Sequence, residues 1–361
     1  MSAARVLLAR QGGRRYPVRI GRVVPAGLVA LARGRDRVAL VSCARVLDTP
    51  IGRRTVSALR RRAPLALVHA LPDGERGKTL RELERAATAL LRAGLTRRSL
   101  VLALGGGAVT DAGGFLAATF MRGVDWVAAP TTLLAMVDAA LGGKTAVNLP
   151  LAKNAVGAFH PPVAVLADPS ALRTLPLREL RSGFAEALKY GLLRPSLLPR
   201  IASRAGAGAA DAGLVADCAR VKLEVVERDP EEHAERKLLN LGHTFGHGVE
   251  AAGRFSRYTH GEAVAVGLAF AFRLSAVLGR IGPEAVAEVE AVLGRAGLPT
   301  RLPPALAARA SALMVHDKKR SATGLRWVLP RQAGRRWTVD WDVEVDPRAV
   351  ARVVSQIGGA R

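Results

Sequence analysis

The residues with the clearest chemical potential lie between positions 236 and 260. The run contains Arg236, Asn240, His243 and His247, spaced four, three and four residues apart, and a T-H-G-E motif with His260 follows it. A single helix would place the first four side chains on one face. A core-facing helix would carry leucine, valine or alanine there. Imidazole, guanidinium and amide groups bind metals and anions, so this face predicts a metal and anion site.

The histidines allow more than one ligand set. His243 and His247 could bind one metal together, or one could bind metal while the other meets substrate. Glu186, His243 and His260 would form a three-ligand site with an open position, as catalytic zinc requires. A glycine directly precedes both His243 and His247. Glycine inside a helix costs about 1 kcal/mol relative to alanine, so we expect another backbone or a ligand to approach closely here.

Earlier segments carry glycines and polar groups where apolar runs end. The triplet Gly105-Gly106-Gly107 follows residues 101–104 and is followed by Asp111. Glycines at a strand-to-helix turn let backbone N–H groups approach a pyrophosphate. The triplet alone could equally be a tight turn, because the G-x-G-x-x-G fingerprint is absent. With Thr131-Thr132 after the next apolar run and the polar loop at 73–78, the pattern indicates a dinucleotide site.

Lysines beside glycines suggest anion contacts. Lys144 follows two glycines in a small apolar segment that also contains Asp138, and Lys153-Asn154 comes soon after. Such a loop can deliver an ammonium group to a bound anion; the alternative is a solvated surface loop. The apolar neighbours disfavour that alternative, because buried charges need partners. Glu186 and Lys189 form either a surface ion pair or a metal ligand beside a substrate-binding ammonium.

The elements that position these residues follow from the apolar periodicity. Runs at 38–42, 65–71, 100–104 and 126–129 predict buried parallel strands joined by crossover helices. A capping pattern at Thr79 predicts a helix that ends near Gly94. Long helical stretches follow at 183–193, 216–228, 237–252, 262–278 and 283–296, with short strands within 325–345. We predict a Rossmann-like α/β domain over 1–175 that carries the dinucleotide site, a mainly helical domain over 176–361 that carries the metal and anion site, and an active site in the cleft between them.

Composition argues against several classes of protein. The net charge of +24 is spread along the chain, and aromatic residues make up only 4%, which disfavours nucleic-acid binding. No apolar run approaches the roughly 20 residues of a membrane span. Cys43 and Cys218 lie far apart, so no disulfide framework is expected. Only eight of the 54 basic residues are lysine, and most of these fall in the segments described above. A cytoplasmic enzyme is the natural expectation.

Taken in chain order, the motifs resemble the 3-dehydroquinate synthase family of sugar-phosphate cyclases. They are D-G-E-R-G-K at 73–78, G-G-G-A-V-T-D at 105–111, M-R-G-V-D at 121–125, P-T-T-L-L at 130–134, V-D-A-A-L-G-G-K-T-A-V-N at 137–148, K-N-A-V-G-A-F at 153–159, A-E-A-L-K-Y-G at 185–191, L-N-L-G-H-T-F-G-H at 239–247, H-G-E-A-V at 260–264 and D-K-K at 317–319.

The resemblance implies cyclisation of 3-deoxy-D-arabino-heptulosonate 7-phosphate to 3-dehydroquinate with release of phosphate, in the shikimate pathway. NAD⁺ would transiently oxidise the C5 alcohol and be regenerated in each turnover. A divalent metal, Zn²⁺ or Co²⁺, would be held by Glu186, His243 and His260. The family also implies a homodimer.

The resemblance further assigns two sets of contacts. His247 takes the place of a substrate-contacting imidazole, suited to a proton relay at the C5 hydroxyl. The other substrate and catalytic positions are Asp138, Lys144, Asn154, Lys189, Lys222, Arg236, Asn240 and a lysine of the pair Lys318 and Lys319. The cofactor positions are Asp73, Gly74, Glu75, Lys78, Gly105, Gly106, Gly107, Asp111, Thr131, Thr132, Lys144 and Lys153.

One position departs from the family pattern, and several activities stay open. Where the family carries Asp or Asn after the first strand, this chain has Cys43 and Arg45, and arginine there can accommodate the 2′-phosphate of NADP. Related cyclases that make 2-deoxy-scyllo-inosose, a valiolone or aminodehydroquinate are the nearest alternatives. The many cations suit a substrate with both carboxylate and phosphate, which the amino analogue also has. A metal-dependent alcohol dehydrogenase would instead produce net NADH.

Overall fold

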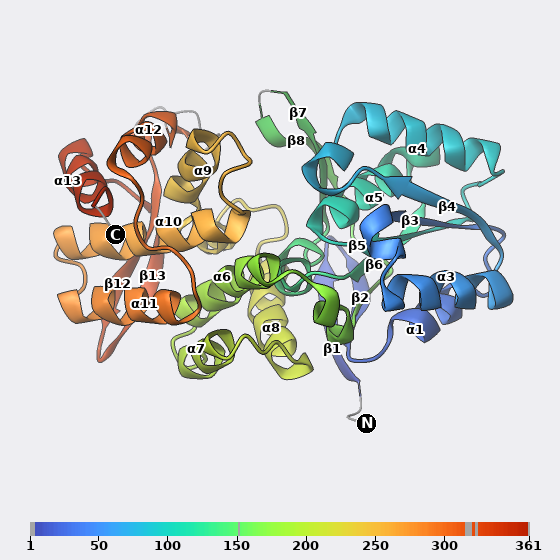
Figure 1. The fold of residues 1–361 in the computed structure, drawn as a ribbon, viewed down its shortest axis with the longest axis horizontal. Coiled ribbons are helices and arrows are strands. Elements are labelled where there is room, and N and C mark those ends of the chain that lie inside the picture. Colours follow the sequence, from blue (N-terminus) through green and yellow to red (C-terminus); the bar gives the residue numbers. More distant parts are fainter. Residues whose placement is uncertain (1–3, 151, 315–319, 322–323, 360–361) are drawn as a thin grey trace. The chain divides into compact units, whose positions relative to one another are not determined.

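The chain forms two compact units (Figure 1). The computed structural model describes residues 4–150, 152–314, 320–321 and 324–359. Unit 1 comprises Met1–Leu175 and Ala210–Pro230, and unit 2 comprises Pro176–Ala209 and Glu231–Arg361. One part of the sequence prediction is wrong here, because α8 (Ala212–Arg228) belongs to unit 1 and not to the helical domain. Contacts with β1 (Arg5–Gln11) and the π-helical turn η3 (Ala135–Ala139) hold α8 in that unit.

Unit 1 is built on a seven-stranded sheet with the order β1-β2-β9-β6-β5-β3-β4. All neighbours pair in parallel except the antiparallel hairpin of β1 and β2. The remaining strands of the sheet are β2 (Arg14–Ile20), β3 (Val38–Cys43), β4 (Leu65–Leu71), β5 (Leu100–Gly105), β6 (Asp125–Pro130) and β9 (Ala164–Ala167). The four strands predicted from apolar runs are β3 to β6, so the α/β prediction is confirmed. The expected burial of 65–71 is wrong, because β4 lies at the edge of the sheet and only Leu71 in it is buried.

Helices cover both faces of this sheet, α1 (Val24–Ala32) and α3 (Pro50–Arg62) on one and α4 (Leu80–Arg92) and α5 (Gly107–Thr119) on the other (Figure 1). Every residue of β3, β5 and β9 is buried, which explains why these strands appear in the sequence as continuous apolar runs. Shorter elements of unit 1 are α2 (Ala44–Leu47), η1 (Gly74–Gly77), η2 (Phe120–Arg122), η4 (Pro169–Thr174) and the hairpin of β7 (Lys144–Leu149) and β8 (Ala152–Phe159).

Helix α4 begins and ends where the sequence predicts. The Thr79 hydroxyl accepts a hydrogen bond from the backbone N–H of Glu82 at 3.2 Å, as an N-cap does. Gly94 follows the helix with φ +72°, the left-handed conformation that ends helices and favours glycine. Because β4 precedes this helix and β5 follows it, the two signals fix where α4 crosses between strands.

Unit 2 is mainly helical and is centred on α10 (His260–Val277). Helix α10 contacts α6 (Leu177–Leu193), α9 (His243–Ala252), α11 (Pro283–Arg295), α13 (Pro347–Ile357) and β12 (Trp327–Ala333). Among the described residues, α10 alone has the length and apolar composition to cross a membrane, and 72% of it is buried in the protein, as in a core helix. The remaining elements are α7 (Leu198–Gly206), η5 (Glu235–Asn240), α12 (Pro304–Met314), β10 (Arg320–Ser321), β11 (Gly324–Leu325) and β13 (Arg336–Val343).

The segment that links η5 to α9 corrects another prediction. A single helix was expected over 237–252, with Arg236, Asn240, His243 and His247 on one face. Instead, the first two lie in the 3-10 turn η5, and the chain turns at Gly242 with φ +79° before α9 begins. Only the two histidines share a helix. A Cβ atom at Gly242 would lie 2.8 Å from the backbone nitrogen of Leu268 in α10, so this close contact with α10 fixes where the chain turns.

Candidate metal centre and polar clusters

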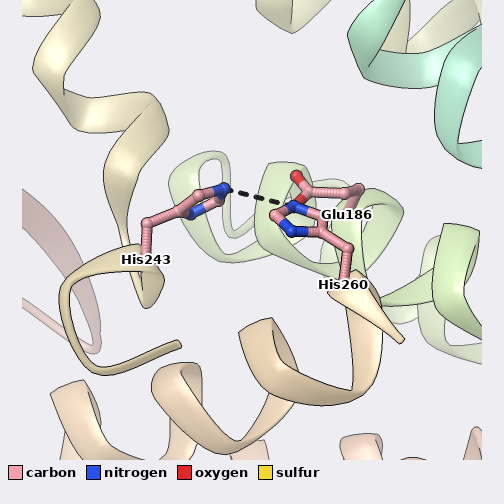
Figure 2. Close-up of side chains that lie close together, drawn as sticks. All are labelled: Glu186, His243 and His260. Carbon is pink, nitrogen blue, oxygen red and sulfur yellow. Dashed lines mark ion pairs between the residues drawn. The ribbon is translucent and has the colours of Figure 1, made fainter. Parts of the chain in front are cut away.

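Three side chains from separate helices of unit 2 converge in the arrangement of a metal site (Figure 2). Glu186 lies on α6, and His243 and His260 are the first residues of α9 and α10. Oε1 of Glu186 lies 3.5 Å from Nε2 of His243 and 3.3 Å from Nε2 of His260. One ligand atom from each residue lies within 4.8 Å of the other two. Two imidazole nitrogens and one carboxylate oxygen are a ligand set that catalytic zinc uses.

Both imidazole rings are oriented by a contact to their other nitrogen. Nδ1 of His243 lies 3.2 Å from the backbone oxygen of Leu241, and Nδ1 of His260 lies 3.4 Å from Oε2 of Glu250. An acceptor at Nδ1 favours the tautomer in which Nε2 offers its lone pair. Both Nε2 atoms also face Oε1 of Glu186, so the three atoms could bind one cation. In this way a carbonyl and a second carboxylate support the three-residue cluster from outside.

The cluster has the electrostatics of a cation site. Glu186 is fully buried, and its second oxygen, Oε2, forms an ion pair with the buried ammonium of Lys189. Burial lowers the pKa of His260, but hydrogen bonds to Glu186 and Glu250, together with the charges of these carboxylates, raise it to about 10. The two carboxylates therefore attract a positive charge to the ring. A divalent ion at Nε2 would take the place of that proton.

Glycines allow the ligand-bearing helices to approach each other closely. A Cβ atom at Gly267 of α10 would lie 1.8 Å from the carbonyl oxygen of Gly242, and one at Gly246 of α9 would lie 3.1 Å from that of Ala263. The glycines before the two histidines thus meet the backbone of α10. For Gly246, which lies within α9, this confirms the sequence prediction that a close approach offsets the cost of glycine in the helix. Gly242 lies outside the helix, where its left-handed conformation favours glycine.

The other predicted residues of unit 2 lie on the same elements. His247 stacks edge-on against His243, with ring centroids 5.5 Å apart. Arg236 is buried, with 1% of its surface exposed, and Nδ2 of Asn240 donates to Oε1 of Glu232 at 2.6 Å. Lys318 and Lys319 lie outside the described residues.

Unit 1 joins several of the predicted cofactor residues around Lys78. This buried ammonium donates to Oδ2 of Asp111 at 2.7 Å and to Oδ1 of Asn154 at 2.5 Å. Burial raises the pKa of Asp111, and Lys78 opposes that shift. Asn148 donates through Nδ2 to Glu75 at 2.6 Å and accepts from the backbone of Asn154 at 2.9 Å. Asn154 was expected among the substrate contacts. In the structure it contacts Lys78, a residue of the expected cofactor set, directly.

The glycine triplet forms the predicted strand-to-helix turn. Gly105 ends β5, Gly106 is the N-cap of α5, and Gly107 begins that helix. A Cβ atom at Gly106 would lie 3.0 Å from the Thr132 side chain, and the backbone N–H of Thr131 donates to the Gly105 carbonyl at 2.8 Å. The turn thus presents the N-terminus of α5 beside both threonines, an arrangement suited to a phosphate group.

Two further contacts of unit 1 involve predicted residues. Lys222 on α8 donates to the backbone oxygen of Asp138 at 2.7 Å and to its carboxylate Oδ1 at 2.6 Å. Asp73, with Gly74 in the turn after it, lies 3.7 Å from Nε of Arg45. Lys144 begins β7, and Lys153 lies near the start of β8. Burial raises the pKa of Cys43, which lies beside Asp73 and Arg45, to about 11.

Two carboxylates of unit 2 that contact predicted site residues were not predicted from the sequence. Glu250, which is buried, follows His243 by seven residues and His247 by three, so the helical period placed it on their face. Glu232, which accepts from Asn240, has no comparable signal. It lies in an irregular segment with φ +65°, so only the tertiary structure brings it to Asn240.

Solved structures with the same architecture define the class of protein. The fold is shared with 2-epi-5-epi-valiolone synthase from Streptomyces hygroscopicus subsp. jinggangensis 5008, solved with NAD⁺ and Zn²⁺ bound, with a TM-score of 0.82 at 27% identity over 95% of this chain and 96% of that one. A 2-deoxy-scyllo-inosose synthase complexed with carbaglucose-6-phosphate, NAD⁺ and Co²⁺ has a TM-score of 0.83 at 24% identity, over 98% and 100%. The fold is that of the sugar-phosphate cyclases.

Sequence comparison then identifies the family. Residues 68–182 match the 3-dehydroquinate synthase N-terminal model, and residues 183–320 match the 3-dehydroquinate synthase C-terminal model. A 3-dehydroquinate synthase of Xanthomonas axonopodis pv. citri (strain 306) is 47% identical over 312 residues, which cover 80% of this chain and 84% of the relative. The chain belongs to the 3-dehydroquinate synthase family.

Proposed function

We propose that this enzyme converts 3-deoxy-D-arabino-heptulosonate 7-phosphate to 3-dehydroquinate and phosphate, using NAD⁺ and a divalent metal. The observation that carries the proposal is the cluster of Glu186, His243 and His260 in a chain of the 3-dehydroquinate synthase family. Because phosphate leaves by elimination, the enzyme would be a carbon–oxygen lyase. The proposed place of the reaction is the shikimate pathway, in the cytoplasm, and the proposed assembly is a homodimer.

The cluster fits a divalent metal, Zn²⁺ or Co²⁺. Its ligand atoms are one buried carboxylate oxygen and two nitrogens of imidazoles that can be neutral. Both rings have an acceptor at Nδ1. When bound, the metal would polarise the C4 and C5 hydroxyls, and NAD⁺ would accept hydride transiently from C5. Lys189 would hold the Glu186 carboxylate in place through its ion pair at the other oxygen.

We assign substrate binding to the cationic and polar residues that the family resemblance indicates. The ammonium and guanidinium groups would bind the carboxylate and phosphate of the substrate, since compact and forked cations suit these anions. His247, edge-on to His243, would hold and move the proton at the C5 hydroxyl. The proposed set also includes Asp138, Lys144, Asn154, Lys189, Lys222, Arg236, Asn240 and one of Lys318 and Lys319.

We assign NAD⁺ binding to unit 1. The glycine turn and the start of α5 would receive the pyrophosphate through backbone N–H groups. The network of Glu75, Lys78 and Asp111 would then meet the nucleotide from the neighbouring loop. The full proposed set is Asp73, Gly74, Glu75, Lys78, Gly105, Gly106, Gly107, Asp111, Thr131, Thr132, Lys144 and Lys153.

The direct test is turnover of the heptulosonate phosphate with catalytic amounts of NAD⁺. Phosphate release that greatly exceeds the NAD⁺ present, with no net NADH, is the expected result and separates a cyclase from an alcohol dehydrogenase. The amino analogue of the substrate and glucose 6-phosphate are assayed in parallel, because they distinguish aminodehydroquinate and inosose synthases. No phosphate release from the heptulosonate phosphate with zinc and NAD⁺ present would refute the proposal.

A ligand substitution tests the metal site separately. His243→Ala is expected to abolish zinc binding and phosphate release while circular dichroism stays that of the wild type. His233→Ala is the matched control, because that imidazole is 80% exposed and contacts Glu231, outside the cluster. Full activity of the His243 variant, or equal loss in both variants, would remove His243 from the ligand set.

A further inference from the structure

One face of α6 meets the first turn of α10 at three successive levels. Residues 178, 182 and 186 of α6 are four apart, so they lie on one face of the helix. Their partners run in the opposite direction along the start of α10, at residues 262, 261 and 260. The last of these levels is the contact between Glu186 and His260. The other two levels therefore fix the two helices on which these ligands stand.

The middle level is a buried backbone contact. The N–H of Gly261 donates to Oγ of Ser182 at 3.0 Å, and Ser182 has 2% of its surface exposed. A Cβ atom at Gly261 would lie 2.0 Å from the carbonyl oxygen of Ser182. Only glycine fits this approach, so the residue after His260 is held directly against the helix that carries Glu186.

The outer level is a bidentate ion pair between Arg178 and Glu262. Nε and Nη2 of Arg178 donate to Oε1 and Oε2 of Glu262 at 2.8 and 2.7 Å, and Nη2 also donates to the carbonyl oxygen of Arg257 at 2.8 Å. Glu262 also closes the capping box of α10, since its Oε2 accepts from the N–H of Thr259 at 2.8 Å. The pair thus connects α6 to both sides of His260. A bidentate guanidinium–carboxylate pair fixes geometry as well as adding energy.

We propose that Arg178 and Ser182 are positioning residues of the metal site, because they hold the start of α10 in the register that brings His260 to Glu186. The inference rests on the metal site of the proposed function. It does not concern overall stability, since Arg178 is 56% exposed and exposed ion pairs contribute little to folding. The expected effect is on ligand geometry, and therefore on metal affinity.

The variants separate the effect of the Arg178–Glu262 ion pair from that of the capping box and from the general stability of α10. Arg178→Ala removes the ion pair and leaves the capping box. Glu262→Gln also removes the ion pair, while glutamine can still cap the helix. Arg178→Lys keeps the charge without the fork. Arg273→Ala is the matched control, because Arg273 lies near the other end of α10, away from His260, and pairs with Glu290 of α11 at 2.5 Å.

The measurement is the Kd for zinc of the metal-stripped enzyme, together with the visible spectrum of the cobalt-loaded enzyme. Loss of an orienting contact weakens metal binding by about 10- to 100-fold. We expect about tenfold for Arg178→Ala and for Glu262→Gln, with an altered cobalt spectrum. Ser182→Ala should behave in the same way, Arg178→Lys should lose less, and Arg273→Ala should match the wild type.

Two results would overturn the inference. One is a zinc Kd for Arg178→Ala within twofold of the wild type with an unchanged cobalt spectrum. The other is an equal loss of affinity in Arg273→Ala, which would indicate a general effect on α10. If the wild type itself bound no zinc, the proposed metal site would fail and this inference with it, so the two failures are distinguishable.

Discussion

The His260 imidazole should be protonated in the metal-free enzyme, and this expectation gives a direct test of the metal centre. Without a cation, Glu186 and Glu250 raise the pKa of His260 to about 10, against the effect of burial. At pH 7 the ring then carries a proton. Zinc needs the lone pair of Nε2, so binding must release this proton. We therefore expect zinc affinity to rise with pH.

The size of the effect follows from the pKa. Each pKa unit corresponds to 1.36 kcal/mol, so displacing the proton at pH 7 costs at most about 4 kcal/mol, or about a thousandfold in Kd. This is an upper bound, because 31% of the His260 side chain is exposed and water screens the two carboxylates. The sign is fixed. A raised pKa means that the competing proton is fully bound at neutral pH and is lost as pH rises toward 10.

The assay is isothermal titration of the metal-stripped enzyme with zinc in two buffers of different ionisation enthalpy. The difference in apparent heat gives the number of protons released, and we expect about one at pH 7. Affinity should increase about tenfold per pH unit between pH 6.5 and 8.5. Glu250→Gln is the matched variant, because glutamine keeps a polar contact to Nδ1 without the charge. It should release fewer protons at pH 8.

A proton count near zero at pH 7 in the wild type would refute this reasoning. It would mean that His260 is neutral in the metal-free enzyme, so that the carboxylates do not act on it as the geometry indicates. An unchanged count at pH 8 in Glu250→Gln would instead remove Glu250 from the electrostatics of the ring.

Two further predictions concern packing and thiol chemistry. Gly267→Ala should force α9 and α10 apart and abolish zinc binding, because its Cβ would lie 1.8 Å from a backbone oxygen. Gly294→Ala in α11 meets nothing within 4 Å, so it should keep zinc affinity and raise the midpoint of thermal unfolding slightly. Because Cys43 and Cys218 are buried and the pKa of Cys43 is about 11, a thiol reagent at pH 8 should label the native enzyme slowly and both cysteines after unfolding. Fast labelling of native Cys43 would contradict its burial.

Local signals predicted much of unit 1. Buried parallel strands need apolar residues on both faces, so β3, β5 and β6 appear as continuous runs that sequence alone locates. The run of β4 has the same apolar character, but this strand lies at the edge of the sheet and is mostly half-buried. Thr79 and Gly94 similarly mark the ends of α4, since each satisfies a local backbone requirement. The place of α8 could not be predicted in this way. Its apolar pattern shows only that it is buried, and which unit buries it depends on contacts distant in sequence.

The metal cluster shows the same division. The family resemblance identified Glu186, His243 and His260 as metal ligands. The structure brings these three side chains together from separate helices. The supposed helical face from Arg236 to His247 was wrong, because the spacing was correct but the chain is not one helix. Gly242 allows a left-handed turn there, and its contact with the backbone of α10 decides that the turn forms.

The amino-acid sequence establishes which groups are available for chemistry: two histidines and a carboxylate for a metal, a glycine turn after β5 for a phosphate, and a small number of lysines, most of them in the motifs. These depend on residue type and short-range spacing, which a chain carries before it folds. How these groups are held depends on tertiary contacts: Glu250 contacts His260, and Arg178 and Ser182 join α6 to the start of α10. Such contacts join residues far apart in the chain, so their geometry exists only once the helices have packed.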